Sequence, residues 1–273
     1  MKARFLLGTH QPGWLTTAGV PLFVSDIRLR VYKTLPRADA PWALDSGGFT
    51  ELQYHGAWTV SPTDYVARVR RYRDEIGRLD WAAPQDWMCE PVVIAGGQFG
   101  PLRFVGTRLS VAEHQRRTVD NYLHLRDIAP ELPFVPVIQG YTRDEYLACT
   151  DLYDQVGVDL TSAPLVGLGS VCRRQATAEA HDIIHALHVR GIRNLHGFGV
   201  KTLGLQLYGD TLKSADSLAW SRDARLKRRP MCGSTRHRNC ANCLDFALDW
   251  RTRLLGGPGS LSQLRETITG GAA

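Results

Sequence analysis

The sequence predicts a parallel α/β fold and, within that class, a (β/α)8 barrel. Short apolar segments that end in polar or glycine residues alternate with helical segments six or seven times along the chain. The chemically distinctive residues follow the strands, and a (β/α)8 barrel carries its active site at those ends. A doubly wound open sheet would share the alternation, but no Gly-x-Gly-x-x-Gly follows the first strand, which counts against a dinucleotide fold.

The expected strands are short apolar runs. Trp42–Phe49 is the clearest example, because the buried strand ends at Asp45 and continues into Ser46 and two glycines, which predicts a tight turn and then a loop through Trp58. Residues 20–35 are apolar but ambiguous between strand and helix. The strands are expected at residues 4–9, 42–45, 81–86, 134–139, 165–170 and 194–200.

Capping signals place the helices between these strands. Ser61 before a proline predicts a helix to about Ile76, and Ser110 predicts one to about Ala129. Thr142, with a glutamate three residues later, resembles a capping box. A glycine-rich loop is expected near residues 96–106, and further helices at residues 176–190, 202–208 and 243–255.

The composition narrows the class of protein. The chain of 273 residues can bury a substantial core, and its net charge of +6 permits an anionic partner without requiring one. No apolar run approaches the roughly 18 residues of a membrane span, and the first residues do not resemble a signal peptide. Six cysteines in a chain of this size do not suggest a disulfide framework. We therefore expect a cytoplasmic protein.

Four residues near the end of the chain form a candidate zinc site. Cys232, His237, Cys240 and Cys243 supply three thiols and one imidazole within twelve residues, a complete tetrahedral set with no position left for chemistry. A reduced or redox-active cysteine pair beside a surface histidine is the alternative. We expect a barrel over residues 1–221, followed by a basic zinc-binding segment over 222–273 whose C-terminal helix packs on the barrel.

A basic run precedes the cysteines, and further cations lie among them. A solvated surface face would explain such a run, but cations around a zinc knuckle favour contact with phosphates. Lys201, after a glycine pair, is a further candidate. The predicted phosphate-binding residues are Lys201, Arg225, Lys227, Arg228 and Arg229.

Several acidic and polar residues follow strands, but the residues alone leave their roles open. Asp216 lies in Ser-Ala-Asp-Ser, where it could cap a helix or serve as a catalytic group. Asp86 and Gln139 could each close a turn or line a site. The histidines of residues 181–188 share one helix stripe without a carboxylate or thiol, so they are expected at the surface or in packing.

The order of these motifs resembles that of the tRNA-guanine transglycosylases and of their DNA-acting relatives, the deazapurine DNA-modification transglycosylases. Asp45-Ser46-Gly47-Gly48-Phe49 and the late Asp216 before the zinc cluster are the most specific parts, and the resemblance covers about residues 40–250. It implies a zinc-bearing barrel with Asp216 as nucleophile and Asp45 as general acid/base. The base-binding residues that it implies, or that lie beside those motifs, are Ser46, Gly47, Phe49, Asp86, Gln139, Gly140, Gly167, Leu168, Gly169, His196 and Phe198.

The chain also departs from the tRNA-modifying members. His237 stands where an early cysteine is usual, Thr50 where a glutamine is common, and no appended RNA-binding domain is evident. These departures favour the compact DNA-acting branch, which phages and mobile modification clusters often encode. The resemblance therefore implies the host cytoplasm for a phage-encoded member.

The expected reaction exchanges a guanine base in DNA for a 7-deazaguanine, such as 7-cyano-7-deazaguanine, in a queuosine-like modification. A carboxylate would capture the sugar C1′ as retaining glycosidases do, and a second acid would protonate the departing base. The target nucleotide must leave its duplex first. The same reaction on tRNA and a non-catalytic nucleic-acid-binding barrel are the alternatives, and a homodimer is left open.

Overall fold

The computed structural model describes residues 3–171, 177–200, 204–205, 207 and 209–256. Eight strands form one sheet in the order β4-β3-β2-β1-β10-β9-β8-β7. β1 to β4 run parallel to one another, as do β7 to β10. The strands are β1 (Arg4–Thr9), β2 (Leu22–Ser25), β3 (Trp42–Asp45), β4 (Leu79–Ala82), β7 (Val137–Ile138), β8 (Val166–Leu168), β9 (Leu195–Gly197) and β10 (Ser214–Ser217).

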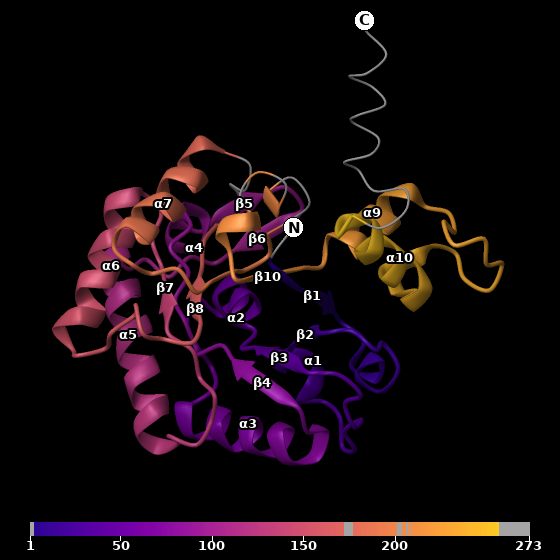
Figure 1. The fold of residues 1–273 in the computed structure, drawn as a ribbon, viewed down its shortest axis with the longest axis horizontal. Helices are drawn as coiled ribbons and strands as arrows, with labels where there is room; N and C mark the ends of the chain where they lie inside the picture. The colour runs from indigo at the N-terminus through magenta and orange to yellow at the C-terminus, as the bar shows by residue number, and fades with distance from the viewer. Residues whose placement is uncertain (1–2, 172–176, 201–203, 206, 208, 257–273) are drawn as a thin grey trace, which may run out of the picture. The chain divides into compact units, whose positions relative to one another are not determined.

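The two edges of this sheet meet. A parallel bridge joins Ala82 at the end of β4 to Phe134, just before β7, and the N–H of Val135 donates to the carbonyl of Ala82 at 3.2 Å. Helices surround the strands (Figure 1). The predicted α/β barrel is therefore confirmed. Its helices are α1 (Asp26–Leu29), α2 (Gly48–His55), α3 (Pro62–Ile76), α4 (Pro91–Ala95), α5 (Val111–Ile128), α6 (Arg143–Gln155) and α7 (Ala178–Val189), with short 3-10 turns η1 (Pro12–Thr16) and η2 (Gly209–Thr211).

The helix starts follow the predicted caps. The hydroxyls of Ser61 and Ser110 accept the backbone N–H groups that cap α3 and α5, and Thr142 forms the complete capping box of α6 with Glu145. The residues expected as a helix over 202–208 lie largely outside the described part of the chain.

Some elements differ from the sequence prediction. Residues 20–35 contain both a strand, β2, and the short helix α1. The turn after Asp45 leads into helix α2 instead of a loop. The expected glycine-rich loop contains an antiparallel hairpin, β5 (Gly97–Phe99) with β6 (Leu102–Phe104), and the short helix α4 directly precedes it. β7 is only two residues long because Pro133 and Pro136 have no N–H for the ladder. β4 likewise ends at Ala82, four residues before Asp86.

Large side chains fill the interior of the barrel. Phe23 of β2 and Trp81 of β4 lie with ring centroids 5.4 Å apart, and Trp81 meets the His196 ring of β9 at 4.6 Å. Such layers make a packed core and not a pore, so a ligand must bind at an end of the barrel. The cluster consists of Leu6, Phe23, Ala43, Trp81, Ala83, Val135 and Leu165, with the half-buried Phe198 against it.

A second compact unit begins at Ser217. It contains α9 (Ala219–Lys227), η3 (Cys240–Asn242) and α10 (Leu244–Leu254), and α9 packs on both of the others. The hydroxyl of Ser221 on α9 donates to the carbonyl of Ala241 at 2.9 Å. The predicted domain boundary after residue 221 and the packing of the zinc-binding segment on the barrel both stay predictions. Over the described residues, no helix is long and apolar enough to cross a membrane.

Candidate active site

Three carboxylates gather at the carboxyl ends of the barrel strands. Asp45 is the last residue of β3, Asp86 follows β4, and Asp216 lies in β10. The charge of Asp216 contributes to a raised pKa of Asp45, and the charge of Asp45 contributes to a raised pKa of Asp86, so the three groups share one region. The helix-cap alternative for Asp216 is wrong, because the residue pairs within the sheet and the N-cap of α9 is Leu218.

Asp216 is held by a histidine and a backbone amide. Its Oδ1 accepts the N–H of Gly199 at 2.9 Å and lies 3.3 Å from Nε2 of His196. Nδ1 of His196 lies 2.8 Å from the hydroxyl of Ser214, two residues earlier in β10 and on the same face. A neutral imidazole with its hydrogen on Nε2 satisfies both contacts, since it donates to Asp216 and accepts from Ser214. Among the described residues no hydrogen bond uses Oδ2 of Asp216.

Asp45 begins a tight turn whose shape depends on the residues that follow it. Its Oδ1 accepts the N–H of Gly47 at 3.0 Å, and the Ser25 hydroxyl at the end of β2 is a second partner. Gly47 has a φ of 85°, and a Cβ there would lie 2.6 Å from Ile27 Cγ1, so glycine is required. Burial raises the pKa of Asp45, and the charges of Asp216 and Asp26 raise it further. A carboxyl with a raised pKa therefore lies beside a second carboxylate.

Asp86 and Gln139 form the second polar pair of the site. Nε2 of Gln139 donates to Oδ2 of Asp86, and Gln139 is fully buried. Burial raises the pKa of Asp86 to about 7, against the lowering effect of this hydrogen bond, with smaller contributions from the charges of Asp45 and Glu90. The amide and the carboxyl together present donors and acceptors of the kind that read the edge of a purine.

Two residues that the sequence interpretation missed complete this network. The hydroxyl of Ser170 lies 2.7 Å from Oε1 of Gln139 and 2.9 Å from Oε2 of the buried Glu90, and it accepts the N–H of Cys89 at 2.9 Å. Ser170 directly follows the predicted Gly-Leu-Gly strand end, a signal that could have identified it. Glu90 has no such signal, because only the fold brings the loop after β4 to the end of β8.

Gly167 in β8 and Gly169 directly after it leave space for neighbouring side chains. A Cβ on Gly169 would lie 2.2 Å from Nε2 of Gln139, and one on Gly167 would lie 2.6 Å from Cε2 of Phe198. Their backbone groups already have partners: the N–H of Gly169 donates to Ile138, its carbonyl accepts from the Tyr146 hydroxyl, and the carbonyl of Leu168 accepts from Phe198. The strand therefore lets two side chains lie close against it, and reading of a base by its backbone stays a prediction.

The other residues expected to bind the base lie in different surroundings. Ser46 is buried beside Asp45, and Phe198 meets the His196 ring edge-to-face at 4.9 Å. Phe49 packs edge-to-face on Phe104 at 5.6 Å, in a side cluster formed by α2, α4 and the β5–β6 hairpin. At Gly140 a Cβ would lie 2.8 Å from the backbone nitrogen of Tyr146.

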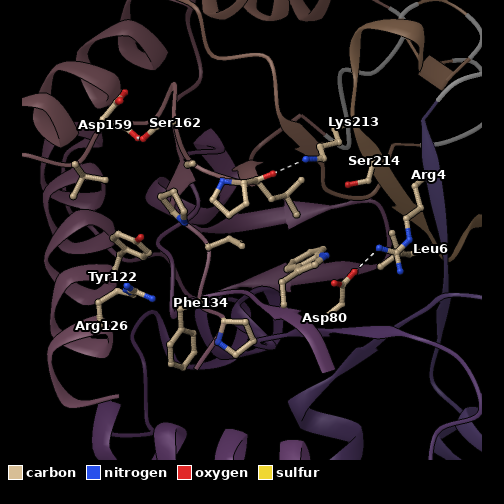
Figure 2. A pocket seen from close by; sticks show the side chains of 18 residues that line it. Arg4, Leu6, Asp80, Tyr122, Arg126, Phe134, Asp159, Ser162, Lys213 and Ser214 are labelled. Atoms are coloured by element: carbon tan, nitrogen blue, oxygen red, sulfur yellow. Dashed lines mark hydrogen bonds and ion pairs between the residues drawn. The ribbon is translucent and has the colours of Figure 1, made fainter. Parts of the chain in front are cut away.

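A cavity of about 800 Å³ opens at the opposite end of the barrel (Figure 2). It is lined by residues at the amino ends of the strands, among them Arg4 of β1 and Lys213 before β10. Arg4 forms an ion pair with Asp80, and Nζ of Lys213 donates to the carbonyl of Pro164 at 2.8 Å. Arg4 and Lys213 thus both have partners within the protein, and the carboxylates described above lie at the other end.

The second unit brings the four predicted metal ligands together. The ligand atoms of Cys232, His237, Cys240 and Cys243 all lie within 4.8 Å of one another. Sγ of Cys232 lies 3.3 Å from Nε2 of His237 and 3.5 Å and 3.7 Å from Sγ of Cys240 and Cys243. A tetrahedral zinc ion with bonds of about 2.3 Å to sulfur separates its sulfur ligands by about 3.8 Å, so the set fits zinc. The five described cysteines are all free thiols, and the disulfide-poor reading holds for them.

The basic run lies in the same unit and is exposed to solvent. Arg225 and Lys227 are in the last turn of α9, and Arg228 ends it with a φ of 53°. Arg229 follows, also exposed. Their contact with phosphate stays a prediction. Lys201 lies outside the described residues.

The fold and the site define a class of protein: a parallel α/β barrel with paired carboxylates at the carboxyl ends of its strands, followed by a unit with a Cys/His cluster. Comparison with known proteins makes this specific. The family model DpdA, described as DeoxyPurine in DNA protein A, matches residues 1–273, so the chain belongs to the DpdA family. DpdA is a tRNA-guanine transglycosylase-like DNA modification enzyme, which confirms the resemblance predicted from the sequence. No curated protein matches the chain.

Proposed function

We propose that the protein replaces a guanine base in DNA by a 7-deazaguanine, such as 7-cyano-7-deazaguanine, through a covalent glycosyl-aspartate on Asp216. Membership of the DpdA family supports a transglycosylase that acts on DNA and deazaguanine substrates. The observation that carries the detailed mechanism is the approach of Asp45 and Asp216, from distant parts of the chain, to within electrostatic reach of each other.

In the first half-reaction the bond between C1′ and N9 of guanine breaks, and C1′ forms a bond with a carboxylate oxygen of Asp216. The contacts of His196 and Gly199 both fall on Oδ1, which leaves Oδ2 as the attacking oxygen. The departing base takes a proton from Asp45, whose raised pKa suits this role. Each displacement inverts C1′, so two in sequence retain its configuration.

In the second half-reaction the incoming 7-deazaguanine attacks C1′ through N9. Its N9 proton passes to Asp45, which was left ionised by the first step, and the ester bond to Asp216 breaks. One residue therefore gives and takes the proton, and the enzyme returns to its starting state. Asp86 would accept hydrogen bonds from N1–H and the 2-amino group of either base, and Gln139 would donate to O6. Both bases share this edge.

The test is incorporation of labelled guanine into polymer. Duplex DNA, single-stranded DNA and tRNA are incubated separately with the protein and labelled guanine. Label in DNA is the expected result, because the DpdA family acts on DNA. Single-stranded DNA is included because a target nucleotide in a duplex must first flip out of its stack. Label in tRNA alone would assign the reaction to tRNA, and no label in any polymer would favour a non-catalytic barrel. Asp216→Asn should abolish incorporation while the far-UV and near-UV circular dichroism stay unchanged.

A further inference from the structure

The amide of Gln139 is held at both of its ends. Nε2 donates to Asp86, and Oε1 lies 2.7 Å from the hydroxyl of Ser170. A carboxamide that turns by 180° exchanges its NH2 and its oxygen at nearly constant shape, so the partners on each side decide which group faces the site. The side chain is fully buried, and water therefore cannot replace either partner.

Ser170 is itself built into place. The N–H of Cys89 donates to its oxygen at 2.9 Å, Oε2 of Glu90 lies 2.9 Å away, and the residue is buried. Its φ of 55° is unusual for a residue with a side chain, so the surrounding contacts must hold the backbone there. The hydroxyl has one hydrogen and two acceptors within reach, Oε1 of Gln139 at 2.7 Å and Oε2 of Glu90 at 2.9 Å, and the contact with Gln139 is the shorter.

Asp86 alone cannot fix the amide. Its pKa is raised to about 7 by burial, so near neutral pH the carboxyl carries a proton for much of the time. A protonated carboxyl can both donate and accept a hydrogen bond, so it can pair equally well with the NH2 or with the oxygen of the amide. The hydrogen bond from Ser170 to Oε1 favours the orientation in which the NH2 points away from Ser170, whatever the protonation state of Asp86.

We propose that Ser170 is a specificity-determining positioning residue: by donating to Oε1 of Gln139, it keeps the amide NH2 facing the base and so selects 6-oxo purines over 6-amino purines. One hydrogen of that NH2 is given to Asp86, and the second serves an acceptor on the base. Guanine and the 7-deazaguanines present a carbonyl oxygen at C6, while adenine and 2,6-diaminopurine present a donor there. This inference rests on the proposed function, since it assumes that Gln139 faces the bound purine.

The experiment compares three bases at one position of an oligodeoxynucleotide. Guanine, hypoxanthine and 2,6-diaminopurine are each placed there, and release of the base is measured in exchange for labelled guanine. Hypoxanthine keeps O6 and lacks the 2-amino group, while 2,6-diaminopurine keeps the 2-amino group and lacks O6. Discrimination at position 6 is thereby separated from discrimination at position 2.

Ser170→Ala should lower the guanine-to-diaminopurine ratio of release rates about tenfold or more, because a free amide can turn its oxygen to the 6-amino group. The guanine-to-hypoxanthine ratio should stay within about twofold, since Asp86 reads position 2. Ser170→Gly, which also relieves the positive φ, should give the same shift. Thr150→Val removes a buried hydroxyl from α6, where it donates to the Leu147 carbonyl, and should leave both ratios unchanged.

The outcomes separate the two levels of the argument. If the wild-type protein exchanges guanine and both Ser170 variants keep its position-6 ratio, or slow all three bases equally, the role of Ser170 is refuted and the proposed function stands. If the wild-type protein exchanges none of the three bases in DNA, the proposed function fails and the role of Ser170 fails with it. Because either variant suffices, a folding defect in one of them does not prevent the test.

Discussion

Replacing Gly169 by alanine tests whether β8 is shaped around the Gln139 side chain. The added Cβ would lie 2.2 Å from Nε2, 2.5 Å from Cδ and 2.6 Å from Oε1 of Gln139. All three distances are far below van der Waals contact, and Gln139 is fully buried with partners on both sides. The amide must therefore leave its place, and its hydrogen bonds must break.

The size of the effect follows from these contacts. Forcing one carbon into a packed interior costs about 1–3 kcal/mol, and leaving a buried polar group without its partner costs a similar amount. Gly169→Ala should accordingly lower the free energy of unfolding by about 2–4 kcal/mol. Guanine exchange by the folded protein should fall by at least about tenfold, because the donor to O6 is displaced.

The assay is a double-mutant cycle with Gln139→Ala, measured by urea unfolding. Truncation of Gln139 removes the atoms that the new Cβ meets, so Gly169→Ala should cost less than about 1 kcal/mol in that background. Gly13→Ala is the control, since a Cβ there has nothing within 4 Å. Equal costs of Gly169→Ala with and without the Gln139 side chain would refute the packing argument, as would undiminished exchange by the Gly169→Ala protein.

Three further predictions concern other parts of the molecule. Folding raises the pKa of Asp86 to about 7, so between about pH 4 and 7 the folded protein holds a proton that the unfolded chain has lost. The free energy of unfolding should therefore fall as the pH rises through this range. Urea unfolding at several pH values should show this fall, and Asp86→Asn should flatten it. His196→Phe keeps an aromatic ring against Trp81 but removes the hydrogen bond to Asp216. Base release in a single turnover should therefore slow at least about tenfold while the protein stays folded. An unchanged rate of release would show that His196 has no part in the mechanism. Elemental analysis should find about one zinc per chain, and Cys240→Ser should lower both the zinc content and the melting temperature. A melting temperature that stays the same after the metal is removed would contradict a structural metal.

Local signals explain which parts of the fold and site could be predicted. The strand ending at Asp45 with its obligatory glycine, and the caps at Ser61 and Thr142, depend on neighbours in the sequence. Asp216 is different: its tetrapeptide is compatible with a helix cap, and its strand is decided by pairing in a sheet whose other members lie far away in the chain. Barrel closure by a single bridge at Phe134, between Pro133 and Pro136, and by the two-residue strand β7 likewise leaves little periodic pattern to detect.

The polar network around Gln139 shows the same limit. Asp86, Gln139, Ser170 and Glu90 come from three separate segments, and only closure of the barrel makes them neighbours. Ser170 could have been predicted, because it lies at the end of a predicted strand, where functional residues of a barrel are expected. Glu90 precedes Pro91, the first residue of α4, and nothing in this local sequence indicates a buried carboxyl.

A trapped covalent intermediate is the most direct test of the central claim, that a carboxylate from β10 captures the sugar while one from β3 carries the proton. Labelled guanine-containing DNA is mixed with the protein, quenched rapidly in denaturant and resolved by denaturing electrophoresis, and the cross-linked peptide is mapped by mass spectrometry. The account predicts a DNA adduct on Asp216 in the wild-type protein and in Asp45→Asn supplied with a better leaving base, and none in Asp216→Asn. An adduct on another residue, or exchange that persists in Asp216→Asn, would contradict it.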